Sequence, residues 1–485
     1  MTTARRSALV FAMLILLALA TLPAAAGAAT SSPQLELGLL NPAFVEALHD
    51  PIVSLGLGRL PSPVEVRVGA GVTARAARAD LPSVYSLVDL GRVTAPVKDQ
   101  GAYSTCWAFA NIAALESKVL SSQAQDLDLD LSEDNLIGRS GYFSTMSQRY
   151  DYGGYDFMAV AYFARWAGPV TEANDPYPTK TLPAVNRVVK HVQGVAMIPG
   201  RSADLDNDLI KQLVMTNGAL SVGMWWDPAA YDAATSSYFL ATQDQWENHG
   251  VCVVGWDDSY SASNFGAGPE TPGGDGAFLV RNSWGKNWGD NGYFWVSYYD
   301  KSFARDKDLG TYGGGASYSD VADVGNYSRN YGYDKLGVTD RLGYTDGSPI
   351  WAANRFTAAS VRKIAAVGFY ALSSGTRYEV WAGPTLKTLT RRASGTASLP
   401  GYETVKLDTP LPVVKGGTFV VAIKLLSPDG SLPLAIERRA ETWHGFQSGA
   451  TARSGQSYVG AQRWRMSDLT LRYHRANVCL KAFAR

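Results

Sequence analysis

Residues 96–110 read "PVKDQGAYSTCWAFA" and contain Cys106, one of only three cysteines in a chain of 485 residues. Small and polar residues precede this cysteine, and an apolar run of helix-forming residues follows it. Ser104 or Thr105 is a suitable N-cap, so we expect a helix that begins at Cys106. The partial positive charge of a helix N-terminus favours a thiolate over a thiol. These neighbours indicate a nucleophile rather than a structural cysteine.

A cysteine nucleophile needs a base that pairs with it as an imidazolium and later protonates a leaving amine. His249, one of five histidines, begins the strand-like run "HGVCVVGW". Asn282 ends the next such run, where it could orient the imidazole, and Trp284 follows closely and could exclude water. The Gln100 amide could donate beside the Cys106 N–H to form an oxyanion hole. We therefore expect a thiolate–imidazolium pair between Cys106 and His249.

The three blocks "PVKDQGAYSTCWAFA", "NHGVCVVGW" and "RNSWGKNWGDNGYFWV" resemble the signature blocks of papain-like cysteine proteases, in the chain order of that family. The spacing of Cys106 and His249 fits the roughly 130–150 residues of the papain type. Asn282 lies beyond that range, which fits the inserted stretch "DDSYSASNFGAGPETPGGDG" between the two predicted strands.

The resemblance, strong over residues 81–300, implies a role for each site residue. Gly153 and Gly154, in "YGGYDF", would hydrogen-bond the substrate backbone, which requires close approach without a Cβ. The catalytic roles are an oxyanion donor, a nucleophile, an acid/base and an orienting amide, with two supporting tryptophans: Gln100, Cys106, His249, Asn282, Trp107 and Trp284.

The sequence departs from the family pattern around the nucleophile. Tyr103 stands where the family usually has a disulfide-bonded cysteine, and Ser104 and Thr105 replace the usual Gly and Ser. The family disulfides are therefore absent, and at most one bridge could form. Cys252 and Cys479 lie in apolar strand-like runs and are expected to be inert core residues.

The N-terminus has the features of an export signal. Arg5 and Arg6 precede the apolar run Ser7–Leu22, and small residues follow, with cleavage expected after Ala26 or Ala29. We assign residues 1–26 to a signal peptide and residues 27–80 to a short pro-segment and linker. The linker "TARAARAD" is small-residue and basic, as expected of an exposed, cuttable segment. A secreted or cell-surface location follows.

The remaining sequence predicts two domains that differ in their secondary-structure patterns. Residues 81–305 show helical patterns first and strands second, which indicates an α+β fold with a helical lobe and a β lobe. The helical patterns are "WAFANIAALESKVL", "LSEDNLIG" with Ser132 as cap, and "YDFMAVAYFARWAG" closed by Gly168; the strands are "ALSVGMWW", "HGVCVVGW", "GAFLVRNSW" and "GYFWVSYY".

Residues 310–485 contain strand-like runs separated by turn signals, which predicts an all-β, sandwich-like domain. The runs include "IAAVGFYAL", "RYEVWAG", "TFVVAIKL", "LPLAIERR" and "DLTLRYHR". Together with the short pro-segment, this domain resembles the lectin-like extension of secreted bacterial and archaeal family members. Four tryptophans could stack on cell-surface glycans or simply pack, and packing is the favoured interpretation: Trp351, Trp381, Trp443 and Trp464.

The charge balance and the motif content of the sequence argue against nucleic-acid, membrane-surface and metal-dependent functions. Lys plus Arg equals Asp plus Glu at 44 each, so no global field favours nucleic acid or a membrane surface. No CxxC, HExxH or histidine spacing of the metal-binding type occurs, and no cofactor is expected. Peptide or protein substrates are the expected partners, without a stable membrane span after signal removal.

Two other interpretations remain open at this point. One is a catalytically silent adhesion or carbohydrate-binding protein on a papain-like scaffold. The other is a transglutaminase-like acyl transferase, whose orienting residue is usually Asp rather than Asn.

Overall fold

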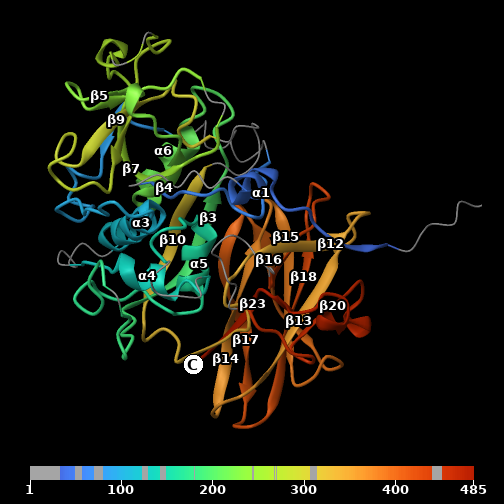
Figure 1. Ribbon diagram of the computed structural model, residues 1–485. Coiled ribbons are helices and arrows are strands. Elements are labelled where there is room, and N and C mark those ends of the chain that lie inside the picture. Colours follow the sequence, from blue (N-terminus) through green and yellow to red (C-terminus); the bar gives the residue numbers. More distant parts are fainter. Residues whose placement is uncertain are drawn as a thin grey trace, which may run out of the picture.

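The computed structural model describes most of the chain in eleven stretches. They are residues 33–49, 57–69, 80–122, 129–142, 149–179, 181–242, 245–266, 268, 270–305, 314–439 and 450–485. The predicted signal peptide, the linker residues 70–79, the joint at 306–313 and Trp443 lie outside them. In the described stretches, no helix is long and apolar enough to span a bilayer. Figure 1 shows a helix-containing body next to a body of long strands.

Three of the predicted helices form the helical lobe. α3 (Cys106–Ser122) begins at the predicted residue and is buried along most of its length. α4 (Glu133–Arg139) has the predicted cap, because the Ser132 side chain accepts a hydrogen bond from the Asn135 N–H. α5 (Asp156–Ala164) ends earlier than predicted. Trp166 adopts a left-handed φ of 61°, which cannot continue a helix, so closure at Gly168 was wrong.

The β lobe is built on antiparallel strands that the sequence largely predicted. The predicted strands correspond to β4 (Leu220–Met224), β7 (His249–Asp257), β8 (Ala277–Arg281) and β9 (Tyr293–Ser297). β4 pairs with β7, β7 with β8 and β8 with β9. Because β7 and β8 are antiparallel, the first residues of β7 lie next to the last residues of β8, at the same end of the two strands.

Several further elements in this lobe were not predicted. They are β2 (Val84–Ser86), β3 (Lys190–Ile198), α6 (Asp208–Asn217), β5 (Tyr231–Asp232), β6 (Ser237–Tyr238) and the 3₁₀ turns Pro228–Ala230 and Ala262–Asn264.

The C-terminal body is all-β, as expected. Its strands are β10 (Gly315–Asp323), β11 (Arg329–Tyr331), β12 (Asp340–Tyr344), β13 (Ile350–Thr357), β14 (Arg362–Ala371), β15 (Thr376–Gly383), β16 (Thr390–Ala397), β17 (Gly401–Val413), β18 (Thr418–Leu426), β19 (Leu434–Arg438), β20 (Ser457–Gly460), β21 (Ser467–Asp468), β22 (Ala476–Val478) and β23 (Leu480–Ala484). Among the described residues, a sheet in the order β16-β15-β18-β13-β20-β21 packs against β14 and β23.

Two details of this domain differ from the sequence prediction. The run "DLTLRYHR" is not a strand, because the Asp468 carboxylate accepts from the Thr470 N–H and caps a 3₁₀ turn at Leu469–Leu471. Cys479 lies between β22 and β23 rather than inside a strand. It is nevertheless buried, as is Cys252 within β7.

The two bodies share one sheet and one core. β17 pairs with β3, and β10 pairs with both β3 and β4. Tyr370, Tyr402 and Phe483 of the C-terminal body join the same apolar cluster as the helices of the first body. β10 therefore belongs to the same sheet as β3, β4 and β7 of the first body, although it follows residue 305. Separate folding of the two predicted domains stays a prediction.

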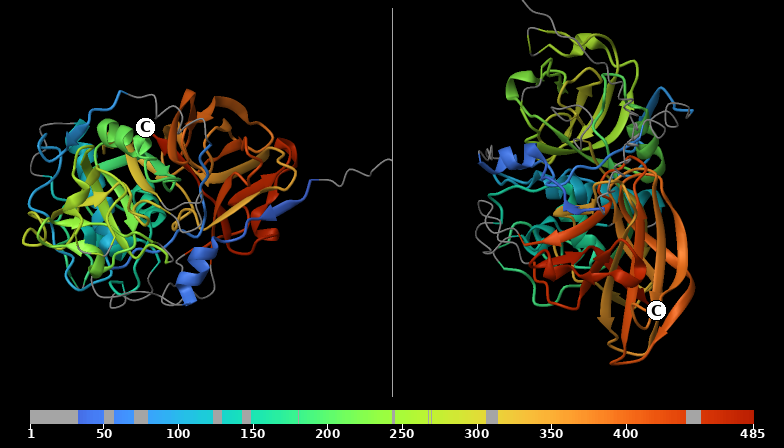
Figure 2. Two further views of the ribbon diagram at one scale, coloured as in Figure 1. Left: turned by 90° about the horizontal axis from the view of Figure 1, so that it is seen from above. Right: turned by 90° about the vertical axis from the view of Figure 1, so that its right-hand side faces the viewer.

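The N-terminal residues join the two bodies. β1 (Leu35–Leu37) adds to the C-terminal body by pairing with β12, and Phe44 of α1 (Pro42–His49) packs edge-on against Tyr155. Residues 57–69, which we call the cleft segment, continue from there between the lobes. At its far end, Arg67 exchanges backbone hydrogen bonds of 3.0 and 2.8 Å with Leu372 and Ser374. In the left view of Figure 2 the blue helix α1 lies at the boundary between the bodies, and the blue strand β1 lies against the C-terminal body.

Candidate active site

Cys106 lies at the start of α3, against the first residues of β7. The Gly250 N–H donates a hydrogen bond to Cys106 Sγ at 3.2 Å, and Cys106 is fully buried. A Cβ on Gly250 would lie 3.3 Å from the Trp107 backbone, so helix and strand are in tight contact here. This contact places the thiol beside His249, the residue that precedes Gly250.

His249 and Asn282 are joined as the sequence predicted. His249 Nε2 lies 2.8 Å from Asn282 Oδ1, which also accepts from the Ser283 N–H at 2.8 Å. His249 Nδ1 is buried and has no hydrogen-bond partner among the described residues. If Nε2 carries the proton donated to Asn282, Nδ1 is left free to exchange a proton with Cys106.

Aromatic rings surround the imidazole. Trp284 stacks on His249, with ring centroids 4.8 Å apart and planes at 18°. Trp226 meets the same imidazole edge-on at 6.1 Å and also contacts Trp284 and Trp288. The stacked ring is the predicted Trp284, and His249 is fully buried; Trp226 and Trp288 were not singled out from the sequence.

Gln100 is fixed between the loop before α3 and the loop after β8. Its Oε1 accepts from Ser283 Oγ at 2.5 Å, and its Nε2 donates to the Tyr103 carbonyl at 2.7 Å. The Gln100 N–H donates to the Ser283 carbonyl at 2.8 Å. An amide nitrogen has two hydrogens, so this arrangement leaves a second N–H of Gln100 for a developing oxyanion.

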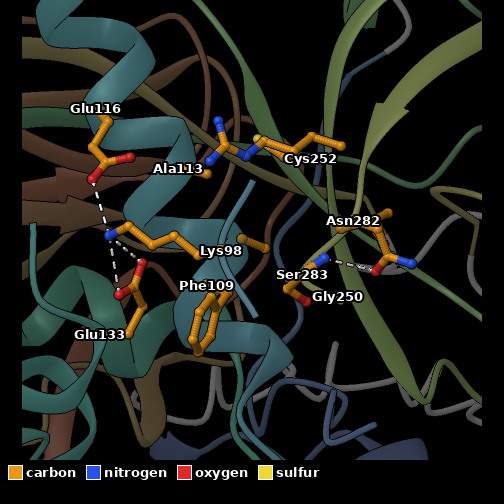
Figure 3. A pocket seen from close by; sticks show the side chains of 12 residues that line it. Lys98, Phe109, Ala113, Glu116, Glu133, Gly250, Cys252, Asn282 and Ser283 are labelled. Atoms are coloured by element: carbon orange, nitrogen blue, oxygen red, sulfur yellow. Dashed lines mark hydrogen bonds and ion pairs between the residues drawn. The ribbon is translucent and has the colours of Figure 1, made fainter. Parts of the chain in front are cut away.

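The loop that contains Gln100 is also held by a buried ion cluster, in which Lys98 of that loop contacts Glu116 of α3 and Glu133 of α4. Lys98 Nζ lies 3.4 Å from Glu116 and 2.9 Å from Glu133, between the two carboxylates in Figure 3. Burial, with the neighbouring Glu116 adding to it and Lys98 opposing it, raises the pKa of Glu133 to about 8. The cluster is structural in this arrangement, and among the described residues no group of His, Cys, Asp or Glu is arranged to hold a metal.

The cleft segment occupies the position predicted for substrate. Gly154 donates its N–H to the Gly58 carbonyl and accepts from the Leu60 N–H, both at 2.9 Å. The Gly58 and Arg59 N–H groups donate to the carbonyl of Asn248, next to His249. Gly153 is also in contact, because a Cβ on it would lie 2.4 Å from the Gly58 carbonyl oxygen. The Gly153–Gly154 pair thus receives an extended chain, and here that chain is the protein's own.

Burial shifts the titration of both the thiol and the imidazole in this covered form. Burial raises the pKa of Cys106 to about 12, against the smaller effects of the Gly250 N–H and the Arg59 charge. Burial lowers the pKa of His249 to about 4, against the hydrogen bond to Asn282. In the covered form both groups are neutral at pH 7. The expected thiolate–imidazolium pair is therefore not the state that this form favours.

Three charged residues of the cleft were missed in the sequence: Arg59, Asp156 and Glu247. Arg59 is the one cation in the largely apolar, proline-rich run "LGLGRLPSPVEV", which also contains Ser62 and Glu65, and it is only 2% exposed. Asp156 begins the apolar helix α5, and Glu247 lies two residues before His249. An isolated charge in an apolar run is a signal of a buried ion pair, but the partners are not readable from one sequence.

A cysteine at a helix N-terminus, beside an asparagine-oriented histidine between a helical and a β lobe, defines a thiol hydrolase of the cysteine protease class. The family model "Papain family cysteine protease" matches residues 82–308, and the model "Lectin like domain" matches residues 330–484. The first body of the chain is thus similar to papain-family cysteine proteases, and the C-terminal body is similar to lectin-like domains.

Similar proteins agree with this assignment. Cysteine protease 1 of Oryza sativa subsp. japonica is 31% identical over 242 residues, which cover 49% of this chain and 45% of that protein. Cathepsin S of Mus musculus is 30% identical over 241 residues, which cover 46% and 60%. The chain thus matches less than two thirds of either relative.

A solved structure extends the similarity to both domains. The crystal structure of the cysteine protease and lectin-like domains of Cwp84, a surface layer associated protein of Clostridium difficile, has a TM-score of 0.77 at 24% identity. It covers 93% of this chain and 98% of that chain. At this identity the likeness concerns the fold, including the placement of the lectin-like domain.

Proposed function

We propose that this protein is an exported cysteine endopeptidase, made as a latent form whose cleft segment must leave before substrate can enter. The observation that carries the proposal is the 2.8 Å contact between His249 and Asn282, with Cys106 bound to the neighbouring Gly250 N–H. A silent scaffold has no need to keep nucleophile, base, orienting amide and oxyanion donor together.

The first half of the reaction forms an acyl-enzyme. When the cleft segment leaves, water and the approaching imidazolium favour the Cys106 thiolate, which attacks the carbonyl carbon of the scissile peptide bond. The oxyanion is held by the Cys106 N–H and the Gln100 amide. His249 then donates its proton to the leaving amine, and the C–N bond breaks to give a thioester.

The second half regenerates the enzyme. Neutral His249 accepts a proton from water, which attacks the thioester carbonyl, and the C–S bond breaks as the carboxylic acid product forms. Asn282 keeps the ring oriented through both halves. Gly153 and Gly154 hold the substrate backbone, while Trp107 and Trp284 support the helix start and shield the histidine.

Export and surface retention complete the proposed function. The N-terminal signal supports export, and the similar protein Cwp84 is described as surface layer associated. For glycan binding by the lectin-like domain, Trp464 is the best placed of the three predicted tryptophans that the structure describes, since it is 70% exposed. Trp351 and Trp381 pack edge-on against each other.

The direct test is hydrolysis of a fluorogenic peptide library by the full chain after release of the cleft segment. We expect hydrolysis by the wild-type protein and its complete loss in Cys106→Ala. Transfer of the acyl group to an added amine, without hydrolysis, would favour the acyl transferase instead. Absence of either reaction would favour the silent binding protein.

A further inference from the structure

The side chain of Arg59 fills a pocket beside the candidate active site. Its Nη1 and Nη2 lie 2.6 and 2.7 Å from the two carboxylate oxygens of Asp156. Its Nε lies 3.2 Å from Glu247 Oε1. This is a two-pronged guanidinium–carboxylate contact with a second carboxylate on the remaining N–H, the strongest geometry for binding arginine.

The protein holds this pocket in place without help from the cleft segment. Asp156 Oδ1 also accepts from Asn111 Nδ2 of α3 at 2.8 Å and from Ser221 Oγ of β4 at 3.0 Å. Asp156 is the first residue of α5, where the helix dipole favours a negative charge. A Cβ on Gly223 would lie 1.4 Å from Glu247 Oε2, so the Glu247 carboxylate fits only because residue 223 is glycine.

The charges of this pocket demand a cation. Asp156 is fully buried and Glu247 is 8% exposed, and within the part of the chain that the structure describes both form ion pairs with Arg59. When the cleft segment leaves, both carboxylates lose this guanidinium in a desolvated site, and a cation that takes its place restores the ion pairs. The forked arrangement around Asp156 fits a planar guanidinium better than an ammonium group.

The pocket is also in register with the residues that hold an extended chain. Arg59 pairs directly with Gly154, and its N–H donates to the carbonyl next to His249. Any chain that pairs with Gly154 in the same manner directs one side chain into this pocket. A substrate in the cleft therefore presents a residue to Asp156 and Glu247 close to the bond that Cys106 attacks.

We propose that Asp156 and Glu247 form the specificity pocket of the protease, and that it selects substrates with an arginine within the three residues preceding the cleaved bond. The cleft segment uses Arg59 to occupy the same pocket. This inference rests on the proposed function and names its substrate class: polypeptides with arginine near the cleavage site, rather than those with large apolar residues there.

The test compares arginine with citrulline, which has the same shape and no charge. The full chain, after release of the cleft segment, is given fluorogenic tripeptides with arginine, citrulline, lysine or leucine at each of the three positions. At one position we expect kcat/KM to fall about 10- to 100-fold from arginine to citrulline, with lysine in between. Equal values for arginine and citrulline at all three positions would overturn the inference.

Two variants test whether the preference for arginine over citrulline arises from the carboxylates of the pocket. Glu247→Gln should reduce the ratio of kcat/KM for arginine to that for citrulline by about tenfold, because one carboxylate loses its charge. Asp151→Asn removes an exposed carboxylate two residues before Gly153 and should leave the ratio as it is. An unchanged ratio in Glu247→Gln would contradict the assignment.

Inhibition by a peptide with the sequence of the cleft segment tests the arginine preference of the pocket without new substrates. A synthetic peptide of residues 57–66 should inhibit hydrolysis, and replacing its arginine with citrulline should raise the inhibition constant at least tenfold. If leucine and citrulline peptides are cleaved with the same kcat/KM as arginine peptides, the inference about the pocket is wrong, but the proposed peptidase activity is supported. If no peptide is cleaved and Cys106 resists iodoacetamide, the proposed function itself fails.

Discussion

The α-carbon of Gly58 lies against the backbone of Ser104, two residues before Cys106. A Cβ on Gly58 would lie 2.3 Å from the Ser104 carbonyl oxygen, and the φ angle of Gly58 is +148°. No other amino acid fits there without displacement. The cleft segment therefore depends on this glycine to approach the nucleophile so closely.

Replacement of Gly58 should weaken latency. In Gly58→Ala the methyl group cannot be accommodated, and overpacking of this kind costs about 1–3 kcal/mol. We expect the full-length variant to hydrolyse fluorogenic peptides without prior cleavage, several-fold faster than the wild-type full chain. Gly69→Ala is the matched control, because its Cβ would meet only Ser374 Oγ, at 3.4 Å. A Gly58→Ala protein as latent as wild type would contradict the role of the cleft segment.

Thiol reactivity should distinguish the covered from the uncovered form. Burial raises the pKa of Cys106 to about 12 in the covered form, so the thiol stays protonated at pH 6 to 8. We expect iodoacetamide to label Cys106 slowly in the full chain and rapidly once the cleft segment has left, with activity lost in step. His249→Ala should slow labelling of the uncovered form, because the imidazolium partner is gone.

The other two cysteines serve as internal controls for this experiment. Burial raises the pKa of Cys252 to about 12 and that of Cys479 well above its ordinary value. Both should remain unlabelled in either form, as mass spectrometry of the digested protein would show. Equal labelling of all three would mean that no activated thiol exists.

The sequence predicted the parts of the site that short motifs carry. Cys106, His249 and Asn282 each stand at or next to the end of an element with a clear pattern, and Gln100 lies in the loop before α3; the hydrogen bonds join His249 to Asn282, Cys106 to Gly250 and Gln100 to Ser283. Helix starts were predicted well where a capping side chain marks them, as at Ser132. The end of α5 was not, because the turn at Trp166 depends on tertiary contacts.

The sequence did not predict the relations between distant segments. Nothing in the pattern around Arg59 names Asp156 and Glu247 as its partners, since ion pairs between distant residues depend on the folded chain. Strand propensity also does not predict which strands pair, so it could not predict that β17 pairs with β3 and joins the two bodies. The neutral state of Cys106 and His249 follows from their burial in the folded chain, whereas the helix N-terminus alone indicated a thiolate.

Asn282 should act through the orientation of His249. In Asn282→Ala the imidazole loses the 2.8 Å contact to Oδ1, although Trp284 still stacks on it. A misplaced acid/base lowers the rate on the order of 10²-fold. We expect the loss in kcat, with KM nearly unchanged and the thermal unfolding midpoint within a few degrees of wild type. A large change in the unfolding midpoint with unchanged kcat would indicate a merely structural role.

The shared sheet predicts how truncation affects stability. A chain ending at Arg305 lacks β10, which pairs with β3 and β4, so the edges of both strands become exposed. A chain ending at Gly325 keeps β10 but still lacks β17. We expect the soluble yield and unfolding midpoint to rise from the first to the second and again to the full chain. A chain ending at Arg305 that is as stable as the full protein would show that the catalytic domain folds separately.

Acid should promote release of the cleft segment in Cys106→Ala, the variant that cannot form a thiolate. The pKa of His249 is about 4 in the covered form, below its ordinary 6.5, because burial disfavours the charged ring. With no thiolate to balance the imidazolium, a depressed histidine pKa means that the uncovered form of this variant binds more protons. The contribution to the covered form is therefore fully present above pH 6.5 and is lost as the pH falls towards 4. Over that window it amounts to roughly 3 kcal/mol at most.

Hydrogen exchange measures this release directly. The amides of Arg59 and Leu60 donate to Asn248 and Gly154 in the covered form, so they exchange only when the segment opens. After correction for the intrinsic effect of pH, we expect their protection in full-length Cys106→Ala to fall steadily between pH 6.5 and 4. Adding His249→Ala to that variant should make the fall smaller, because the titrating ring is absent. Protection that is constant across this range, or equally pH-dependent without His249, would contradict an acid-sensitive latent form.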